Sequence, residues 1–469
     1  MIKNEVRSEL FLRYIQNIKD NIVVVIEDNY IDKVYRNIFS NYLSTKLNAY
    51  EQRCLRISFF KQDFDLSEIL DNPSFPEIII ENYLGFMIIR PIVPGLVGRT
   101  AISPEALAYG DDINVLRAPI RTSFLGIKLV VEAFPLSSQD SEYATCAETS
   151  IWAVMEYFGN KYPEYTPILP SFIHKELDRN SYQRHIPSSG LVYTDISLVL
   201  QSFGFGCKIY CLETPEFPGY DKDELHRIFS SYVDSGVPMI AAIGMDSSEG
   251  HAIVCVGKEK TDRNLIETCK VYTTPFDNKR IRIWADVKMN FIFNDDNSNC
   301  YVCADYDCPT PQYKDEKPYI SSIIVPLYRK VYLDAPRALE LSIALLDEEP
   351  FFFKEEMAIR TFLASGRTYL DYLMRDPILD VSTKAAIIDF VSFPKFIWIT
   401  EISSLDDFKQ HKVEGLLILD ATEPMEYTVG YPLLACFDDK MHYFCPKTSM
   451  LKKYCLNLQF KSISFENYK

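Results

Sequence analysis

The chain has 469 residues, of which 47% are hydrophobic and 24% charged, and its formal net charge is −16. This is the composition of an ordinary globular protein, and the length allows two to four domains. No cluster of Lys and Arg is longer than a pair such as the one in LKKY. A nucleic-acid-binding protein needs a concentrated basic face, so we expect no nucleic-acid partner.

No run approaches the ~18 apolar residues of a membrane span, and the opening MIKNEVRSELFLRYIQNIKDN interleaves charged and apolar positions. We therefore expect no membrane association, no export signal and a cytoplasmic protein. In such a chain the 12 cysteines are expected to be reduced thiols, with one available for chemistry.

Changes in glycine content and in the pattern of strand-like and helix-like segments divide the chain into three parts, 1–122, 123–325 and 326–469. The first alternates helical NYIDKVYRNIFSNYLSTKL with strand-like IVVVIE, CLRISFF, PEIII and YLGFMIIRPIV, which predicts a mixed α/β module. The middle part holds 10 of the 17 glycines, which indicates the tight turns that sites need. The last part runs from helical ALELSIALLDE and MAIRTFLASGRTYLDYLM to strand-like FIWIT, GLLILD and LLACF, and predicts a second α/β module.

The segment CAETSIWAVMEYF, which follows the polar run QDSEYAT, has the pattern of an amphipathic helix. Its apolar positions from Ile151 to Phe158 recur at helical spacing, and Gly159 supplies a stop signal. Cys146 therefore falls in the first turn, where unpaired N–H groups and the helix dipole stabilise a thiolate. The alternative is that Cys146 is a small buried residue at a helix start.

A nucleophilic thiol needs a base, and the chain has six histidines. His251 follows strand-like PMIAAIG and a small polar loop, and it is the first residue of strand-like HAIVCVG. Gly250 lets the backbone turn closely, and the strand would hold the imidazole in place. The alternative is a surface loop histidine. His226, in DELHRIFSSYV, is expected to be a solvated helix residue.

The segment KMNFIFNDDNSNCY predicts a strand that ends at Asn294, Asp295 and Asp296. A carboxylate or amide there can accept the second imidazole N–H and orient the base. The alternative is an ordinary Asn/Asp turn. The chain between His251 and Asp295 is longer than a hairpin requires, and VYTTPFDNKRIRIWADV is expected to form extra strands or a flap.

In this chain order, the cysteine at a helix start, the GHAIV strand and the NDD turn resemble the papain-like cysteine peptidase superfamily. The closer likeness is to its branch of bacteriocin-processing leader peptidases, and it covers about 120–310. The resemblance implies an α+β fold with a two-lobed catalytic domain, in which a helical lobe faces an antiparallel sheet lobe. Two mixed α/β modules would flank that domain.

On this likeness Cys146 is the nucleophile and His251 the general base and acid. Asp295 is the orienting residue, with Asn294 and Asp296 as alternatives. Papain-like enzymes also carry a glutamine shortly before the cysteine, and Gln139 matches it. Its amide would donate to the oxyanion, a contribution typically worth ~2.7 to 4 kcal/mol.

The resemblance implies a cysteine hydrolase, a peptidase that acts on a protein or peptide substrate and uses no cofactor and no metal. Control by a regulatory protein partner, in a bacterial stress, toxin or defence system, is a conjecture from the flanking modules. Two alternatives stay open. The same residues serve deamidases, acyl transferases and isopeptidases, and the fold can also be retained as a non-catalytic protein-binding module.

Cys300, Cys303 and Cys308 in NCYVCADYDC raise a zinc hypothesis. Structural zinc usually has four ligands, and neither a second CxxC nor a spaced His pair appears in the sequence. We therefore predict reduced cysteines in a loop and no metal site.

Overall fold

The computed structural model describes residues 11–69, 72–93, 95–180, 184–246, 250–276, 278–347, 356–423 and 432–468. These residues form two compact units, and the chain passes back and forth between the units. The described residues of unit 1 fall within Met1–Cys211, Pro238–Lys260 and Asn290–Pro326, and those of unit 2 within Leu212–Val237, Thr261–Met289 and Leu327–Lys469.

The two expected domain boundaries lie differently with respect to these units. The boundary near 325 falls where the chain leaves unit 1 for the last time, whereas the boundary near 122 falls inside unit 1. The division into 1–122, 123–325 and 326–469 itself stays a prediction.

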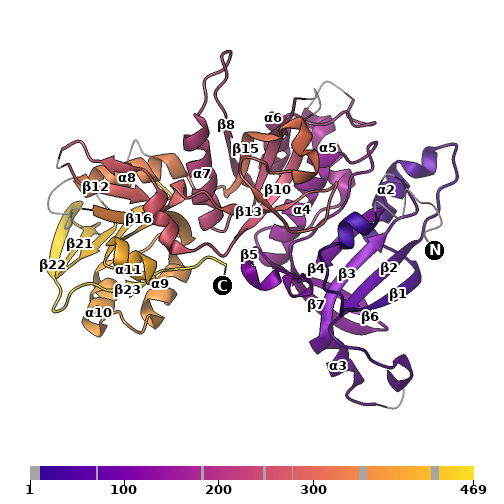
Figure 1. Ribbon diagram of the computed structural model, residues 1–469, viewed down its shortest axis with the longest axis horizontal. Coiled ribbons are helices and arrows are strands. Elements are labelled where there is room, and N and C mark those ends of the chain that lie inside the picture. The colour runs from indigo at the N-terminus through magenta and orange to yellow at the C-terminus, as the bar shows by residue number, and fades with distance from the viewer. Residues whose placement is uncertain are drawn as a thin grey trace. The chain divides into compact units, whose positions relative to one another are not determined.

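The described part of unit 1 contains two sheets and a hairpin (Figure 1). The smaller sheet is antiparallel, with its strands in chain order: β1 (Val23–Tyr30), β2 (Cys54–Phe60), β3 (Tyr83–Ile89) and β4 (Val97–Ile102). The hairpin of β6 (Ala118–Phe124) and β7 (Ile127–Ala133) packs against β3 and β4 through β7. The larger sheet consists of β14 (Val302–Asp305), β13 (Asn290–Asn294), β10 (His251–Glu259), β9 (Met239–Gly244), β15 (Tyr319–Tyr328) and β8 (Phe205–Cys211) in this order, with β5 (Ile113–Val115) paired to β10.

Strand β10 positions the candidate site. All its residues except the last are buried, as expected for an apolar strand that is covered on both faces. It pairs antiparallel with β9 and with β13, and Val254 lies opposite Asn294. Because β10 and β13 run in opposite directions, the residues that follow Asn294 lie beside His251, at the start of β10.

Five α-helices belong to the described part of unit 1: α2 (Lys33–Asn41), α3 (Phe75–Asn82), α4 (Cys146–Lys161), α5 (Pro170–Asn180) and α6 (Tyr193–Ser202). Helix α4 packs against β10 and β6, and its residues from Ala147 to Phe158 are buried. This packing holds the two chain segments that carry Cys146 and His251 against each other.

Two local expectations in unit 1 are wrong. Helix α4 begins at Cys146 as expected, but it continues past Gly159 to Lys161. Gly159 instead allows close packing, since a Cβ there would lie 2.2 Å from the backbone nitrogen of Pro167. PEIII, expected as a strand, belongs to α3, where Pro76 stands in the first turn and favours a helix start.

The described part of unit 2 is built on an eight-stranded sheet. Its order is β11 (Val271–Thr273), β12 (Arg280–Ile283), β16 (Glu356–Ser365), β17 (Phe396–Ser403), β19 (Gly415–Asp420), β20 (Leu434–Phe437), β21 (Lys440–Cys445) and β22 (Met450–Cys455). Strands β12 and β16 are parallel, and the other neighbours are antiparallel. Its described part also contains the strand pair β18 (Lys412–Val413) and β23 (Ser462–Ile463), and the α-helices α7 (Lys222–Asp234), α8 (Ala335–Asp347), α9 (Gly366–Arg375), α10 (Val381–Phe390) and α11 (Leu405–Lys409).

Three expectations concern segments of unit 2. The stretch between β10 and β13 forms extra strands, as one of its two interpretations predicted, because it supplies β11 and β12 to the sheet. The segment MAIRTFLASGRTYLDYLM is not one helix but β16 followed by α9. Strand β16 is buried on both faces, and a continuous apolar run has no period that separates strand from helix. His226, expected on a solvated face, is buried on α7.

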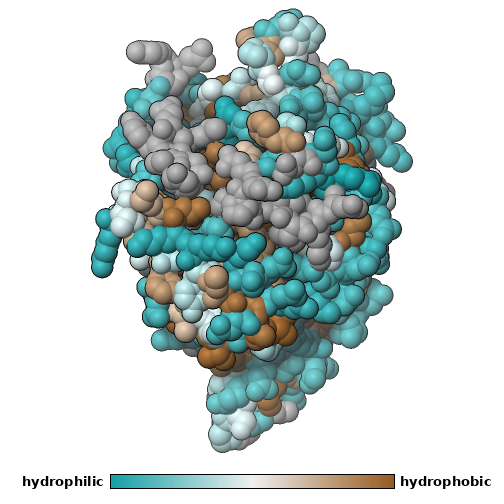
Figure 2. Space-filling view, turned by 90° about the vertical axis from the view of Figure 1, so that its left-hand side faces the viewer, coloured by the Kyte–Doolittle hydropathy of each residue, from teal (hydrophilic) through white to brown (hydrophobic). Residues whose placement is uncertain are grey.

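Helices and several antiparallel sheets together confirm the α+β class, whereas the papain-like two-lobed arrangement stays a prediction. Among the described helices we find none whose length and hydrophobicity would let it span a lipid bilayer. On the face in Figure 2, hydrophilic residues cover most of the coloured surface, and hydrophobic ones lie in small groups.

Candidate active site

The start of helix α4 is held by hydrogen bonds from both sides of Cys146. The Glu148 carboxylate accepts from the backbone N–H and the hydroxyl of Thr145, as in half of a capping box. The same carboxylate accepts a hydrogen bond of 2.6 Å from the Ser188 hydroxyl. Just before the helix, Asp140 Oδ1 accepts from three backbone N–H groups, at residues 142–144. The backbone around Cys146 is therefore fixed on both sides.

The Cys146 thiol is half-buried and lines a pocket of about 650 Å³. Gln139 and His251 line the same pocket, together with the small polar residues Ser188 and Ser189. The structure thus brings three of the four expected site residues to one cavity. The fourth, Asp295, lies behind His251.

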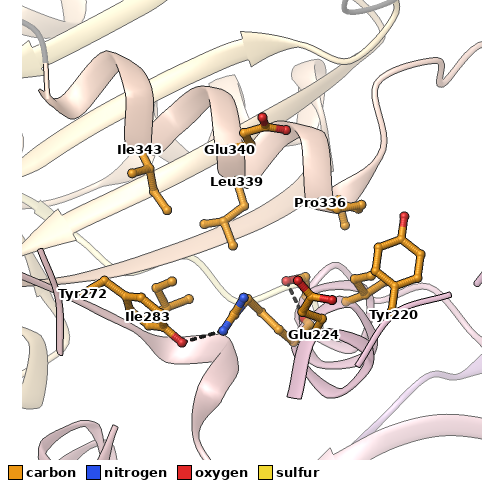
Figure 3. A pocket seen from close by; sticks show the side chains of 12 residues that line it. Tyr220, Glu224, Tyr272, Ile283, Pro336, Leu339, Glu340 and Ile343 are labelled. Atoms are coloured by element: carbon orange, nitrogen blue, oxygen red, sulfur yellow. Dashed lines mark hydrogen bonds between the residues drawn. The ribbon is translucent and has the colours of Figure 1, made fainter. Parts of the chain in front are cut away.

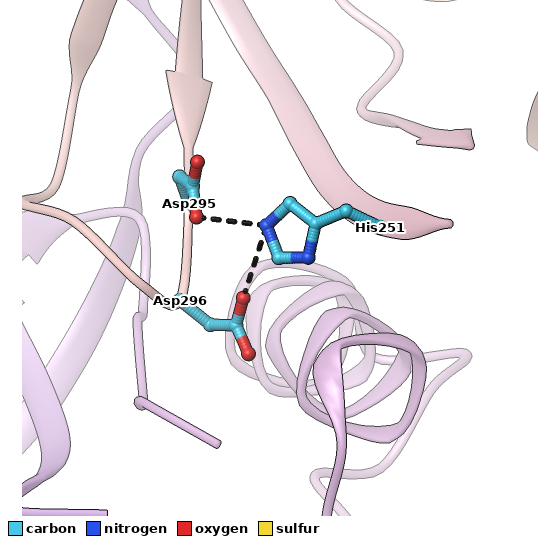
Figure 4. A group of neighbouring side chains, drawn as sticks. All are labelled: His251, Asp295 and Asp296. Carbon is cyan, nitrogen blue, oxygen red and sulfur yellow. Dashed lines mark hydrogen bonds and ion pairs between the residues drawn. The ribbon is translucent and has the colours of Figure 1, made fainter. Parts of the chain in front are cut away.

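The His251 ring lies between a thiol and a pair of carboxylates. Its Nε2 is 3.0 Å from Asp295 Oδ1 and 3.5 Å from Asp296 Oδ1. The second ring nitrogen, Nδ1, faces away from both carboxylates (Figure 4). The Cys146 side chain lies within hydrogen-bonding reach of the ring, and Nδ1 is the nitrogen left for it.

Charge around the ring favours the imidazolium form. Burial of the ring lowers the pKa of His251, but Asp295, with help from the Cys146 hydrogen bond and Asp296, outweighs burial. The pKa of His251 is therefore raised well above its usual 6.5. A protonated ring beside a thiol stabilises a thiolate.

Asp295 and Asp296 are both buried, but they differ in their hydrogen-bond donors. Asp295 Oδ1 accepts 2.9 Å from the Asn297 backbone N–H, and its Oδ2 accepts from the Gln312 amide. Burial by itself raises the pKa of Asp295, but His251 and these donors outweigh burial and lower it. Asp295 is therefore the carboxylate that stays ionised.

Asp296 receives much less support. Its Oδ2 is 3.2 Å from the Thr149 hydroxyl, while its Oδ1 accepts no hydrogen bond and has only the 3.5 Å ion pair with His251. Burial raises the pKa of Asp296 to about 7, and the neighbouring Asp295 charge adds to this shift. The site therefore contains one carboxylate that takes up a proton near neutral pH.

Asn294, the other alternative for the orienting residue, faces elsewhere. Its side-chain oxygen accepts 2.9 Å from the Tyr301 backbone N–H, and its amide donates 3.4 Å to the Pro135 carbonyl. Of the three residues in the NDD turn, only the two aspartates face His251.

Gln139 lies at the pocket, and its amide donates 2.7 Å to the side-chain oxygen of Asn297. An amide nitrogen has two N–H groups, so this bond orients the amide and leaves one donor for a ligand.

Sequence reasoning missed three residues beside the site. Asn297 orients Gln139, Gln312 binds Asp295, and the Tyr313 ring stands edge-on to the His251 ring with centroids 6.0 Å apart. Gln312 and Tyr313 belong to a short 3₁₀ segment, η7 (Pro311–Glu316). Asn297 directly follows the NDD motif and was open to the same argument, whereas PQYKDE carries no pattern that links it to a histidine.

One group of side chains in the described part of the chain has the spacing of metal ligands. His251 Nε2 and one oxygen from each of Asp295 and Asp296 lie within 4.8 Å of one another, and these are atom types that Zn²⁺ accepts. A cation there would have to displace the hydrogen bond of 3.0 Å between His251 and Asp295. Within the described ranges Cys300, Cys303 and Cys308 form no such group, so nothing supports the zinc hypothesis for them.

Unit 2 has a pocket of its own, of about 320 Å³, between α7 and α8 (Figure 3). Its walls are mainly apolar, and Arg227 is the cation among them. Arg227 donates 2.7 Å to Asp286 and 2.5 Å to the Tyr272 hydroxyl. No nucleophile-and-base pair lines it, so it does not compete with the thiol pocket as a candidate active site.

No family model matches the chain, and no curated protein matches it either. The papain-like resemblance therefore depends on the residues themselves.

Proposed function

We propose that this chain is a papain-like cysteine hydrolase, a peptidase of the cytoplasm that cleaves amide bonds in protein or peptide substrates. One observation carries the proposal. The His251 ring has a thiol on one side and a buried, well-supported carboxylate at 3.0 Å on the other, at the wall of a pocket.

The proposed reaction uses the two ring nitrogens separately. With the Nε2 proton directed to Asp295, Nδ1 takes the proton of the Cys146 thiol, which gives the thiolate and the imidazolium that the carboxylates stabilise. The thiolate attacks the substrate carbonyl carbon, and the protonated ring gives its proton to the leaving amine as the C–N bond breaks. Water then attacks the thioester, gives a proton to the ring and releases the acid and the thiol.

Gln139 supports the negative charge that forms on the carbonyl oxygen. Asn297 holds the Gln139 amide, so a donor at the pocket wall does not have to reorganise during the reaction. A donor of this kind is fixed before charge develops, which is what makes oxyanion stabilisation effective.

The proposal is tested by the pH dependence of Cys146 alkylation with iodoacetamide, followed by peptide mass spectrometry in the wild type and in His251→Ala. We expect fast labelling of Cys146 well below pH 8, and slowing by roughly 10- to 100-fold in the variant because the imidazolium partner is lost. Cys303 is an internal control. Burial and Glu259 raise the pKa of Cys303 to about 11, so its labelling should be slow at these pH values in both proteins.

Equal and slow labelling of Cys146 in both proteins would sink the proposal, because it would mean that the thiol and the ring do not act together. If labelling behaves as expected, product mass identifies the reaction. A cleaved peptide indicates a peptidase, and a mass gain of about one dalton indicates a deamidase. Two molecules joined covalently indicate an acyl transferase.

A further inference from the structure

The pocket of unit 2 between α7 and α8 has a volume of about 320 Å³, which lies at the lower end of the range for small-molecule sites. All the residues that line it belong to unit 2. The proposed hydrolysis uses residues of unit 1, so it leaves this pocket without a function.

The Arg227 guanidinium is held in place at the wall of this pocket. Its Nε donates 2.7 Å to Asp286 Oδ1, and its Nη2 donates 2.5 Å to the Tyr272 hydroxyl. The guanidinium carbon also lies 5.3 Å from the centre of the Tyr272 ring. Because these contacts fix the guanidinium in advance, a ligand that binds to it avoids most of the entropic cost of ordering the side chain.

The guanidinium still has N–H groups to offer to a ligand. It carries five N–H donors, and the bonds to Asp286 and Tyr272 use two of them. In the part of the chain that the structure describes, no other group accepts a hydrogen bond from the Arg227 side chain, which stays 20% exposed. The pocket therefore presents fixed hydrogen-bond donors at a wall that is otherwise mainly apolar.

The apolar part of the wall comes from both sides of the pocket. Figure 3 shows Leu339 and Ile343 directed from α8 toward Tyr272 and Ile283, and the Glu340 carboxylate directed away from them. Leu339 and Ile283 are buried, and Ile343 is partly exposed. Such walls favour a ligand with a hydrocarbon or aromatic body.

The charges around the pocket disfavour an ionised ligand. Asp286 pairs with Arg227 and offsets its charge. Glu224 and Glu340 also line the pocket and are exposed, and Glu340 pairs with Arg337 at 2.6 Å. An anion would meet acidic side chains and an arginine that is already paired, whereas a cation could not accept from Arg227. An uncharged group with an acceptor oxygen avoids both conflicts.

We propose that this pocket binds a small uncharged molecule that has a hydrocarbon or aromatic body and a carbonyl oxygen, which accepts hydrogen bonds from Arg227. The site gives unit 2 a ligand-binding role that does not depend on the reaction at Cys146.

The test titrates the full chain with benzylacetone and with the amine of the same carbon skeleton, and measures binding by saturation-transfer NMR. The ketone offers an acceptor oxygen, whereas the protonated amine offers only donors. Arg227→Met removes the donors, and Ile343→Trp fills the pocket with an indole. Ile388→Trp is the matched control, because Ile388 is 60% exposed on α10 and does not line the pocket. Thermal unfolding shows whether each variant is folded.

We expect a roughly millimolar Kd for benzylacetone and binding of the amine that is weaker by roughly 10-fold or more. Arg227→Met should weaken benzylacetone binding by roughly 10-fold, and Ile343→Trp should abolish it, while Ile388→Trp leaves it unchanged.

Three results would overturn the proposal. Benzylacetone does not bind the folded wild type at millimolar concentrations, the amine binds as tightly as the ketone, or a folded Arg227→Met or Ile343→Trp variant binds the ketone as the wild type does. If Arg227→Met does not fold, the comparison of ketone with amine in the wild type still tests the donors, and Ile343→Trp still tests the pocket.

Discussion

Unit 2 buries an arginine among carboxylates, and unit 1 buries a histidine beside two of them. Arg360 donates 3.0 Å to Asp234, 3.4 Å to Glu401 and 2.6 Å to the Phe465 carbonyl. Glu401 in turn accepts from the Ser464 hydroxyl and the Phe465 N–H, at 2.6 and 2.7 Å. In the histidine cluster, by contrast, Asp296 Oδ1 accepts no hydrogen bond.

The comparison shows which buried charges indicate a site. The arginine cluster is saturated with donors and acceptors and ties β16 and β17 to the C-terminal segment, which is a structural task. The histidine cluster combines an opposing pair of pKa shifts, an incompletely bonded carboxylate and a pocket with a thiol. Perturbed groups beside a pocket are candidates for chemistry, whereas saturated ones are candidates for stability.

The largest expected effect is a loss of stability when the hydrogen bonds of the arginine cluster are broken. Arg360→Met removes the cation that hydrogen-bonds the buried Asp234 and Glu401, and removing one partner of a buried ion pair costs about 3–5 kcal/mol. Urea denaturation measures this loss. Arg337→Met is the matched control, since Arg337 and Glu340 form an exposed pair whose loss should cost less than about 1 kcal/mol. Equal losses would contradict the structural role of the arginine cluster.

The next largest expected effect is a slower reaction of the Cys146 thiol with iodoacetamide. Asp295→Asn removes the ionised partner of His251, and the loss of such a charge lowers an imidazole pKa by about 1–2 units. Alkylation of Cys146 at pH 6 should therefore slow by roughly 10- to 100-fold. Asp376 is as deeply buried but belongs to unit 2, so Asp376→Asn should leave the alkylation rate unchanged. An unaltered rate in Asp295→Asn would remove Asp295 from the proposed mechanism.

The smallest expected effect is a pH-dependent change in the stability of the fold, caused by Asp296. Its pKa is about 7 in the fold and about 3.9 in the unfolded chain, so ionised Asp296 destabilises the fold. This cost is absent below pH 4, grows as the pH rises toward 7 and is constant above. Asp296→Asn should therefore be more stable than the wild type at pH 8, and this gain should shrink as the pH falls and vanish near pH 4. Thermal unfolding at both pH values measures the difference, and a gain at pH 4 would contradict it.

The sequence predicted those parts of the site that short segments determine. The start of α4 at Cys146, the strand that begins at His251 and the strand end at Asn294 each followed from local periodicity, and all three are confirmed. The choice within the NDD turn did not follow, because it depends on the register of β13 against β10. The bond from Gln312 to Asp295 and the bond from Gln139 to Asn297 are tertiary contacts, which no local pattern reports.

Tertiary contacts, which local patterns do not report, also explain why two elements of the fold were predicted wrongly. Strand β16 was expected as a helix because its buried run has no polar side, and Gly159 was expected to end α4 because its contact with Pro167 is tertiary. Both are cases in which packing, rather than local propensity, decided the outcome.

The chain alternates between the two units, and this affects how it folds during synthesis and which of its fragments can fold. Because β12 pairs with β16 from a later part of the chain, the ribosome releases β11, β12 and α7 before most of their sheet exists. A fragment cut at 123 and 325 would keep Cys146, His251 and Asp295. It would also contain α7, β11 and β12 without the rest of their sheet, so their apolar faces would be exposed and prone to aggregation. Because the described chain crosses between the units more than once, a single proteolytic cut cannot release one unit from the other as a continuous fragment.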